Sequence, residues 1–150
     1  MEIKELLNGV IDERELDYRV LIGEAGALKP PLIPFFNLMP ALNLMHRHLV
    51  RGGSVLIHAD VDMDGLGAAK VVREELNAIG FKDIKTCING KREHGMNPQI
   101  VSHVNSKKPS LFIVVDSSSN DLAYLKALEC DVLVLDHHIV EHSEYAGKTA

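Results

Sequence analysis

The feature that most constrains this chain is a row of acidic residues between a predicted strand and a predicted helix. Apolar residues fill the strand at 54–59, and the segment 66–79 has the apolar period of a helix. Between them stand Asp60, Asp62 and Asp64, at every second position. Carboxylates this close repel one another unless a cation lies among them. The segment therefore predicts a divalent-metal site at the turn between strand and helix.

Strand and helix patterns alternate from residue 54 onward. We predict strands at 54–59, 84–89, 111–115 and 131–135, and helices at 66–79, 98–106 and 120–129. Gly80 suits the end of the first of these helices and Pro98 the first turn of the second. Ser119 or Asn120 is the expected cap of the third. This alternation predicts an α/β fold with a mostly parallel sheet flanked by helices.

The part of the chain before the first strand has a different pattern. Helical periodicity covers residues 2–24, and a second helix is expected at 41–50, ahead of Gly52-Gly53. We expect residues 1–52 to form a helical leader packed on the core. Residues 53–150 are expected to form the α/β domain.

The later strands also end in residues that bind metals. Asp116 follows the strand at 111–115, and the triplet Asp136-His137-His138 follows the strand at 131–135. In an open parallel sheet, ligands bind beyond the carboxyl ends of the strands. Because the acidic turn after 54–59 has the same position, we expect all three groups at one edge of the sheet. Imidazole is a common ligand of Mn, Fe and Zn, which strengthens the prediction of a metal site.

The acidic turn is also similar to three other motifs. An EF-hand loop would need its last ligand at position 71, where Val71 stands, and would follow a helix. A haloacid-dehalogenase phosphatase would have Thr in place of Leu66, and its chemistry leaves the Asp-His-His triplet without a role. A dinucleotide fingerprint would need glycine in place of Lys70. A solvated acidic turn is the remaining alternative.

Two further segments have both an ordinary and a functional interpretation. Asp116 alone could cap the next helix, an interpretation that Ser117-Ser118-Ser119 supports. The loop after the second strand carries Lys91, Arg92 and His94, which predict binding of substrate phosphates. A solvated turn is the alternative for this loop.

Composition narrows the functional classes. The formal net charge of −5 argues against a protein that coats nucleic acid by charge alone. It leaves room for a nuclease, whose metal ions supply positive charge at the site. No apolar run has membrane-spanning length, and Cys87 and Cys130 lack CxxC spacing, which predicts reduced residues of the core. We expect a cytoplasmic protein with no membrane segment.

Together the motifs resemble the DHH phosphoesterase superfamily, which is named for a triplet that stands here as Asp136-His137-His138. The pattern His58-x-x-x-Asp62-x-Asp64 would be its first motif and Asp116 its second. Within the superfamily the chain is most similar to the RecJ type of single-strand-specific exonuclease, through the run 58–65 and the loop 92–97.

The resemblance implies two ions, Mn²⁺ or Mg²⁺, that share one aspartate. The implied ligands are His58, Asp62 and Asp116 for one ion and Asp64, Asp116 and His137 for the other. Asp60 would join this metal-binding set or lie just behind it. His138 would lie beside the scissile phosphate or just behind the metal ligands, and Asp136 would orient a histidine. Histidine ligands favour manganese.

Two parts of the family pattern have no counterpart in these residues: a further metal-binding aspartate downstream of the triplet and a C-terminal substrate-binding domain. We expect a C-terminal portion of the same chain or a partner polypeptide to supply them. The implied function is a metal-dependent phosphodiesterase, in first place a RecJ-like 5′-to-3′ exonuclease on single-stranded DNA. The alternatives are a DHH phosphodiesterase for short oligonucleotides or cyclic dinucleotides, and a non-catalytic DHH scaffold in a replication or repair assembly.

Overall fold

The computed structural model describes residues 37–90 and 93–140. Its elements in chain order are α3 (Leu38–Val50), β1 (Val55–Ala59), α4 (Met63–Ile79), β2 (Ile84–Ile88), α5 (Pro98–Lys107), β3 (Leu111–Val115), α6 (Leu122–Lys126) and β4 (Asp131–Leu135). The four predicted strands are confirmed. The helix expected at 2–24 lies outside the described residues, so the division into a leader at 1–52 and a domain at 53–150 stays a prediction.

The strands form one sheet in the order β2-β1-β3-β4, and every neighbouring pair is parallel. The predicted α/β fold is therefore confirmed. All five residues of β1 and of β3 are buried, as expected for central strands that are covered on both faces. In the register, Ala59 pairs with Val115 and Val115 with Leu135. The residues that follow β1, β3 and β4 therefore begin side by side at the carboxyl-terminal edge of the sheet.

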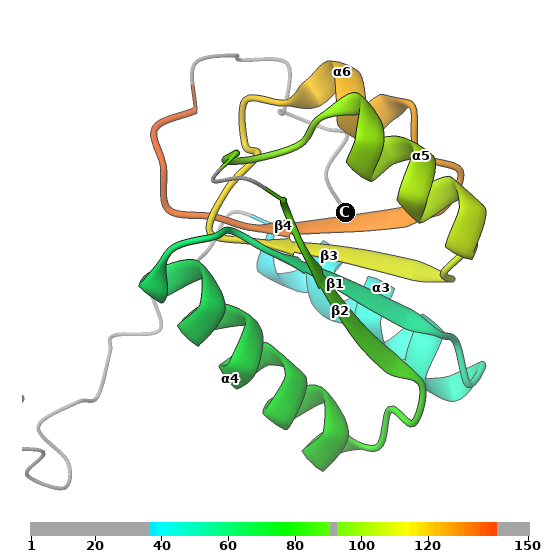
Figure 1. Cartoon of the computed structure of the whole chain (residues 1–150). Helices are drawn as coiled ribbons and strands as arrows, with labels where there is room; N and C mark the ends of the chain where they lie inside the picture. The colour runs from blue at the N-terminus through cyan, green and yellow to red at the C-terminus, as the bar shows by residue number, and fades with distance from the viewer. Residues whose placement is uncertain (1–36, 91–92, 141–150) are drawn as a thin grey trace, which may run out of the picture. The chain divides into compact units, whose positions relative to one another are not determined.

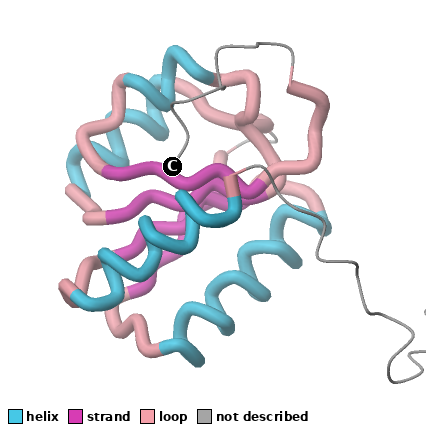
Figure 2. The backbone as a smooth tube through the Cα atoms, turned by 180° about the vertical axis from the view of Figure 1, so that it is seen from behind, coloured by secondary structure: helices cyan, strands magenta, loops and turns pink. Residues whose placement is uncertain are grey.

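Helices cover both faces of the sheet (Figure 1). On one face, Leu44 of α3 and Leu76 of α4 pack in a core cluster with residues of β1 and β3. On the other face, Ile100 and Val104 of α5 pack with Phe112, and Leu125 of α6 borders that cluster. The view from behind shows the same three layers (Figure 2). This packing leaves the ends of the strands as the places where polar side chains can gather.

Local capping explains where the site-bearing helices begin. Helix α4 starts at Met63, earlier than predicted, because the Asp62 carboxylate accepts a hydrogen bond from the Gly65 amide at 3.1 Å and caps the helix. Gly80 ends it with φ 116°, as expected. Helix α5 begins at Pro98, also as expected.

Two helices differ from the sequence-based expectation. Helix α3 begins at Leu38 rather than 41, since Pro40 fits into a first turn, where its missing N–H has no partner to lose. Helix α6 is only five residues long, and Asp121 occupies its cap position without a side-chain cap bond. The expected capping by Ser119 or Asn120 is therefore wrong; the Ser119 amide instead donates to Asp136 at 3.0 Å.

The cysteines behave as predicted for the described part of the chain. Cys87 and Cys130 are half-buried, free of disulfides and packed beside the α5 cluster. Burial raises the pKa of each thiol to about 11, so both are protonated at neutral pH. No described helix is long and apolar enough to cross a membrane.

Candidate metal centre

The first wall of the site is the start of α4, which is pressed against the end of β1. A Cβ added to Gly65 would lie 2.8 Å from the Cβ of Asp60 and 2.9 Å from its Cα, so only glycine fits at this contact. The close approach holds Asp62 at the cap and Asp64 in the first turn of the helix. The bond from the Gly65 amide lowers the pKa of Asp62.

Asp116 forms the centre of the site at the end of β3. Its side chain is 8% exposed, and its backbone has a left-handed φ of 60°, unusual for a residue with a Cβ. One carboxylate oxygen each from Asp62, Asp64 and Asp116 lie within 4.8 Å of one another. Burial, followed by the charges of Asp64 and Asp62, raises the pKa of Asp116. A cation in this group would relieve the repulsion.

The histidines of the triplet meet Asp116 from the other side. The Nε2 atom of His137 lies 3.0 Å from Oδ1 of Asp116. Asp116, His137 and His138 form a second group whose ligand atoms lie within 4.8 Å of one another. Asp116 thus belongs to both groups, as a residue that bridges two ions must.

Asp136 holds His138 in place. Its side chain is 1% exposed, and it accepts bonds from the Ser119 amide at 3.0 Å and from His138, whose amide lies at 3.1 Å and whose Nδ1 lies at 2.6 Å. Burial alone would raise the pKa of Asp136, but these bonds outweigh burial and lower it to about 2. The same contact raises the pKa of His138. The orienting role of Asp136 stays a prediction, and the bond to Nδ1 is the contact through which Asp136 would orient the ring.

His58 is a buried imidazole with one nitrogen unpaired. Its Nε2 lies 3.3 Å from Oδ1 of Asn89, and the Asn89 amide nitrogen donates to the carbonyls of Glu93 at 2.9 Å and Gly95 at 2.6 Å. Because Asn89 Oδ1 can only accept, His58 Nε2 carries the proton and Nδ1 a lone pair. That Nδ1 has no hydrogen-bond partner among the described residues. Burial lowers the pKa of His58, so its imidazole is neutral.

An unpaired, buried lone pair and a crowd of carboxylates fit a transition-metal ion, which takes nitrogen and oxygen ligands together. However, His58 belongs to none of the candidate ligand groups found in the described chain. Its sharing of an ion with Asp62 and Asp116 stays a prediction.

A third group joins the acidic turn to the loop after β2. Nδ1 of His94 lies 2.8 Å from Oδ2 of Asp60, which is buried, and both share the group with Asp62. The bond to Asp60 raises the pKa of His94. The structure therefore places His94, a residue predicted to bind substrate, against Asp60, a residue predicted to bind metal. The other two, Lys91 and Arg92, lie outside the described residues.

Sequence reasoning missed two residues that shape this edge. Asn89 directly follows β2 and ties the loop to His58; its position as the last, polar residue of the predicted strand at 84–89 was the available signal. Asp121 accepts a bond from the Met96 amide at 2.8 Å and so joins the loop to α6. No local pattern distinguishes Asp121 from an ordinary helix-capping aspartate.

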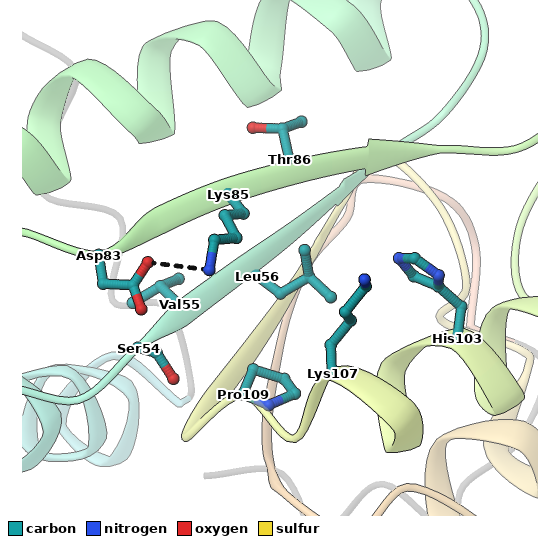
Figure 3. A pocket seen from close by; sticks show the side chains of 9 residues that line it. All are labelled: Ser54, Val55, Leu56, Asp83, Lys85, Thr86, His103, Lys107 and Pro109. Atoms are coloured by element: carbon teal, nitrogen blue, oxygen red, sulfur yellow. Dashed lines mark ion pairs between the residues drawn. The ribbon is translucent and has the colours of Figure 1, made fainter.

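A hollow of about 330 Å³ lies at the opposite edge of the sheet, between the start of β2 and the end of α5 (Figure 3). It is lined by Lys85, His103 and Lys107 over the side chains of Leu56 and Pro109. None of the predicted site residues borders it, so it is separate from the metal centre.

Comparisons with known proteins agree with this fold. The model of the "DHH family, N-terminal domain" matches residues 54–149. A crystal structure of the exonuclease RecJ bound to manganese is 27% identical with a TM-score of 0.64, covering 76% of this chain and 30% of that one. RecJ in complex with Mn²⁺ from Thermus thermophilus is 28% identical with a TM-score of 0.61, covering 77% of this chain and 17% of that one. This chain thus corresponds to less than a third of either structure, and no curated protein matches it.

Proposed function

This chain belongs to the DHH family, because the model of that family's N-terminal domain matches residues 54–149. On that premise we propose that the chain carries the metal centre of a phosphodiesterase. The observation that carries the proposal is the position of Asp116, which stands in one group with Asp62 and Asp64 and in another with His137 and His138. Two ligand groups that share a buried carboxylate are the arrangement that a pair of ions needs. The matched range also supports the predicted domain at 53–150.

Asp62, Asp64, Asp116 and His137 would hold the ions, with His58 and Asp60 as further candidates. When bound, such ions activate water and offset the negative charge of phosphoryl transfer. Manganese suits the mixed set of carboxylate and imidazole better than magnesium does, and both RecJ structures contain manganese.

The remaining residues would position the reacting groups. The buried Asp136 carboxylate fixes the ring of His138 through Nδ1, which leaves Nε2 available to a phosphate oxygen. His138 is more than half exposed, so a substrate can reach it. This contact between Asp136 and His138 therefore supports the predicted place of His138 beside the scissile phosphate.

We propose a RecJ-like 5′-to-3′ exonuclease on single-stranded DNA as the specific activity, because two similar solved structures are those of RecJ. Hydrolysis of short oligonucleotides or cyclic dinucleotides uses the same metal edge and is the second candidate. A non-catalytic scaffold is the third, but a scaffold has no need to keep Asp116 and its neighbours in a mutually repelling group. Because the chain matches only part of RecJ, we propose that a C-terminal portion or a partner polypeptide supplies further grip on the strand.

The test has two readouts. Manganese should raise the thermal midpoint of the protein by mass action, and Asp64→Ala should weaken that shift. Release of nucleotides from a labelled single strand should require manganese, should be weak with residues 1–150 alone, and should rise when the C-terminal portion is supplied. A midpoint that saturating manganese leaves unchanged would contradict the metal centre. Rapid degradation by residues 1–150 alone would contradict the need for a further portion.

A further inference from the structure

The hollow of about 330 Å³ at the amino-terminal edge of the sheet has no part in the proposed metal chemistry. The five residues of β1 separate it from the metal edge by about 16 Å, since a strand rises about 3.3 Å per residue. Among the described residues of β2, Cys87 alone borders the apolar cluster under α5, so the start of that strand stays uncovered on this face. The volume of the hollow lies within the range of about 300–1,000 Å³ that is usual for small-molecule sites.

The floor of the hollow is apolar and fixed by the core. Leu56 is 5% exposed, and Pro109 is buried. The Ser54 amide donates to Oγ of Ser110 at 3.3 Å, and the Ser110 amide donates to Oγ of Ser54 at 3.2 Å. These two bonds tie the start of β1 to the turn before β3. The floor is therefore already formed before any ligand arrives.

Basic side chains reach over this floor from two sides. His103 and Lys107 stand four residues apart on α5 and so lie on one face of the helix. Lys85 comes from β2, and its ammonium group approaches from the strand side (Figure 3). All three side chains are exposed, so a ligand from solution can reach them.

The charges around the hollow do not balance. Asp83 carries the only carboxylate among the described residues that line it, and its ion pair with Lys85 is long, at 3.4 Å. The two side chains of that pair are 52% and 72% exposed, and such a pair contributes little. Lys107 and His103 form no ion pair with any described residue. The hollow thus has surplus positive charge in a chain whose formal net charge is −5.

Each lysine also has an ordinary reason for its position. Lys107, in the last turn of α5, offsets the negative end of the helix dipole. Lys85, on an edge strand, discourages pairing with another chain. Side chains that extend into water serve both purposes equally well. Neither reason explains why the two lysines and His103 meet over one apolar floor.

We propose that this hollow binds a small organic phosphate, with its phosphate group among Lys85, His103 and Lys107 and its apolar part on Leu56 and Pro109. A phosphate suits these donors better than a carboxylate does, because its oxygens point in several directions and the donors come from two sides. The proposal uses neither the metal ions nor a nucleic acid, and so it is independent of the proposed function.

The test is titration of the protein in EDTA, where the metal edge offers a phosphate only carboxylates that repel it. Phenyl phosphate, which joins a phosphate to an apolar ring, should bind at least about threefold more tightly than inorganic phosphate. Acetate should bind more weakly than either. Calorimetry measures the affinities. In NMR spectra, phenyl phosphate should shift the ring resonances of His103 and leave those of His46, an exposed residue of α3, unchanged.

Variants of the exposed lysines locate the site without disturbing the core. Lys85→Ala and Lys107→Ala should each weaken phenyl phosphate binding by about threefold to tenfold. Lys107→Arg keeps the charge and should retain most of the affinity. Lys70→Ala is the matched control, because this lysine of α4 is 72% exposed and lies on the other face of the sheet. It should leave the affinity unchanged.

Two results would overturn the proposal. Acetate that binds as tightly as phenyl phosphate would show that the hollow does not select phosphate. Phenyl phosphate binding that both lysine variants leave unchanged, or that does not move the His103 resonances, would place the ligand elsewhere. A failure of manganese to stabilise the protein would overturn the proposed function and leave this site untouched.

Discussion

The two edges of the sheet hold their carboxylates in opposite ways. At the amino-terminal edge, Asp131 at the start of β4 accepts bonds from Arg47 at 2.9 Å and from His48 at 2.8 Å. The ion pair between Asp83 and Lys85 at this edge follows the same rule (Figure 3). At the carboxyl-terminal edge, carboxylates instead face one another around Asp116.

The pKa values express the same contrast. Burial alone would raise the pKa of Asp131, but the bonds from His48 and Arg47 outweigh it and lower the pKa. Burial and neighbouring carboxylates raise the pKa of Asp116. Asp131 begins β4 and Asp116 follows the neighbouring β3, so both residues belong to the same sheet. The opposite directions of their pKa shifts therefore arise from the side chains that surround each carboxyl group. One edge is arranged for stability and the other for binding a cation.

The largest expected effect is on the carboxyl-terminal edge. At about 100 times its Kd, manganese should add about 2.7 kcal/mol to the free energy of unfolding of the wild type, and Asp116→Asn should lose most of this gain. In EDTA at neutral pH the variant should be at least as stable as the wild type. The reason is that the Asp116 carboxyl has a higher pKa in the folded state than in the unfolded state. Its ionisation therefore lowers the free energy of unfolding as the pH rises from the unfolded-state pKa through the folded-state pKa. Urea unfolding in manganese and in EDTA measures the stability of both proteins under the two conditions. If manganese stabilised Asp116→Asn as much as the wild type, Asp116 would not be a metal ligand.

Two glycines of α4 should differ sharply in their tolerance of a side chain. Gly65→Ala should lower the free energy of unfolding by about 2–3 kcal/mol, because its Cβ would meet the backbone of Asp60 at 2.9 Å. Gly67→Ala, in the same helix with no heavy atom within 4 Å, should raise it by about 0.5–1 kcal/mol. Chemical denaturation compares them. Equal stabilities of the two variants would show that the helix does not press on β1.

Asp136 differs from Asp116 at the same edge, because its hydrogen bonds lower its pKa, whereas the pKa of Asp116 is raised. A folded pKa of about 2 means that its stabilising effect is present above the unfolded pKa of 3.8 and is lost as pH falls from there toward 2. Asp136→Asn should therefore destabilise the metal-free protein by about 2 kcal/mol at neutral pH and have little effect near pH 2. Unfolding curves across this pH range measure the difference. A difference that does not change with pH would mean that the charge of Asp136 is not what matters.

The smallest effect is expected at the amino-terminal edge. Asp131→Asn should lower the free energy of unfolding by about 1 kcal/mol, because the exposed ion pair with Arg47 is weak and the amide oxygen can still accept from His48. It should leave the manganese-induced stabilisation unchanged, in contrast to Asp116→Asn. A smaller manganese gain in Asp131→Asn would show that the two edges are coupled.

Much of this arrangement could be predicted because its signals are local. Runs of Val, Ile and Leu between turn residues identify β1, β3 and β4, and alternation with helices implies a parallel sheet. In such a sheet the carboxyl ends share one edge, so Asp62, Asp116 and His137 could be assigned to one site without coordinates. The chemistry of the edge follows from the residue types alone.

The tertiary structure decided which of these side chains meet. Nε2 of His58 lies against Asn89, which follows β2, and this contact between two strands leaves Nδ1 without a partner among the described residues. His94, which follows β2, pairs with Asp60, which follows β1, at 2.8 Å. The direction of a side chain beyond a strand depends on contacts from other elements, and these contacts join residues that no local pattern relates.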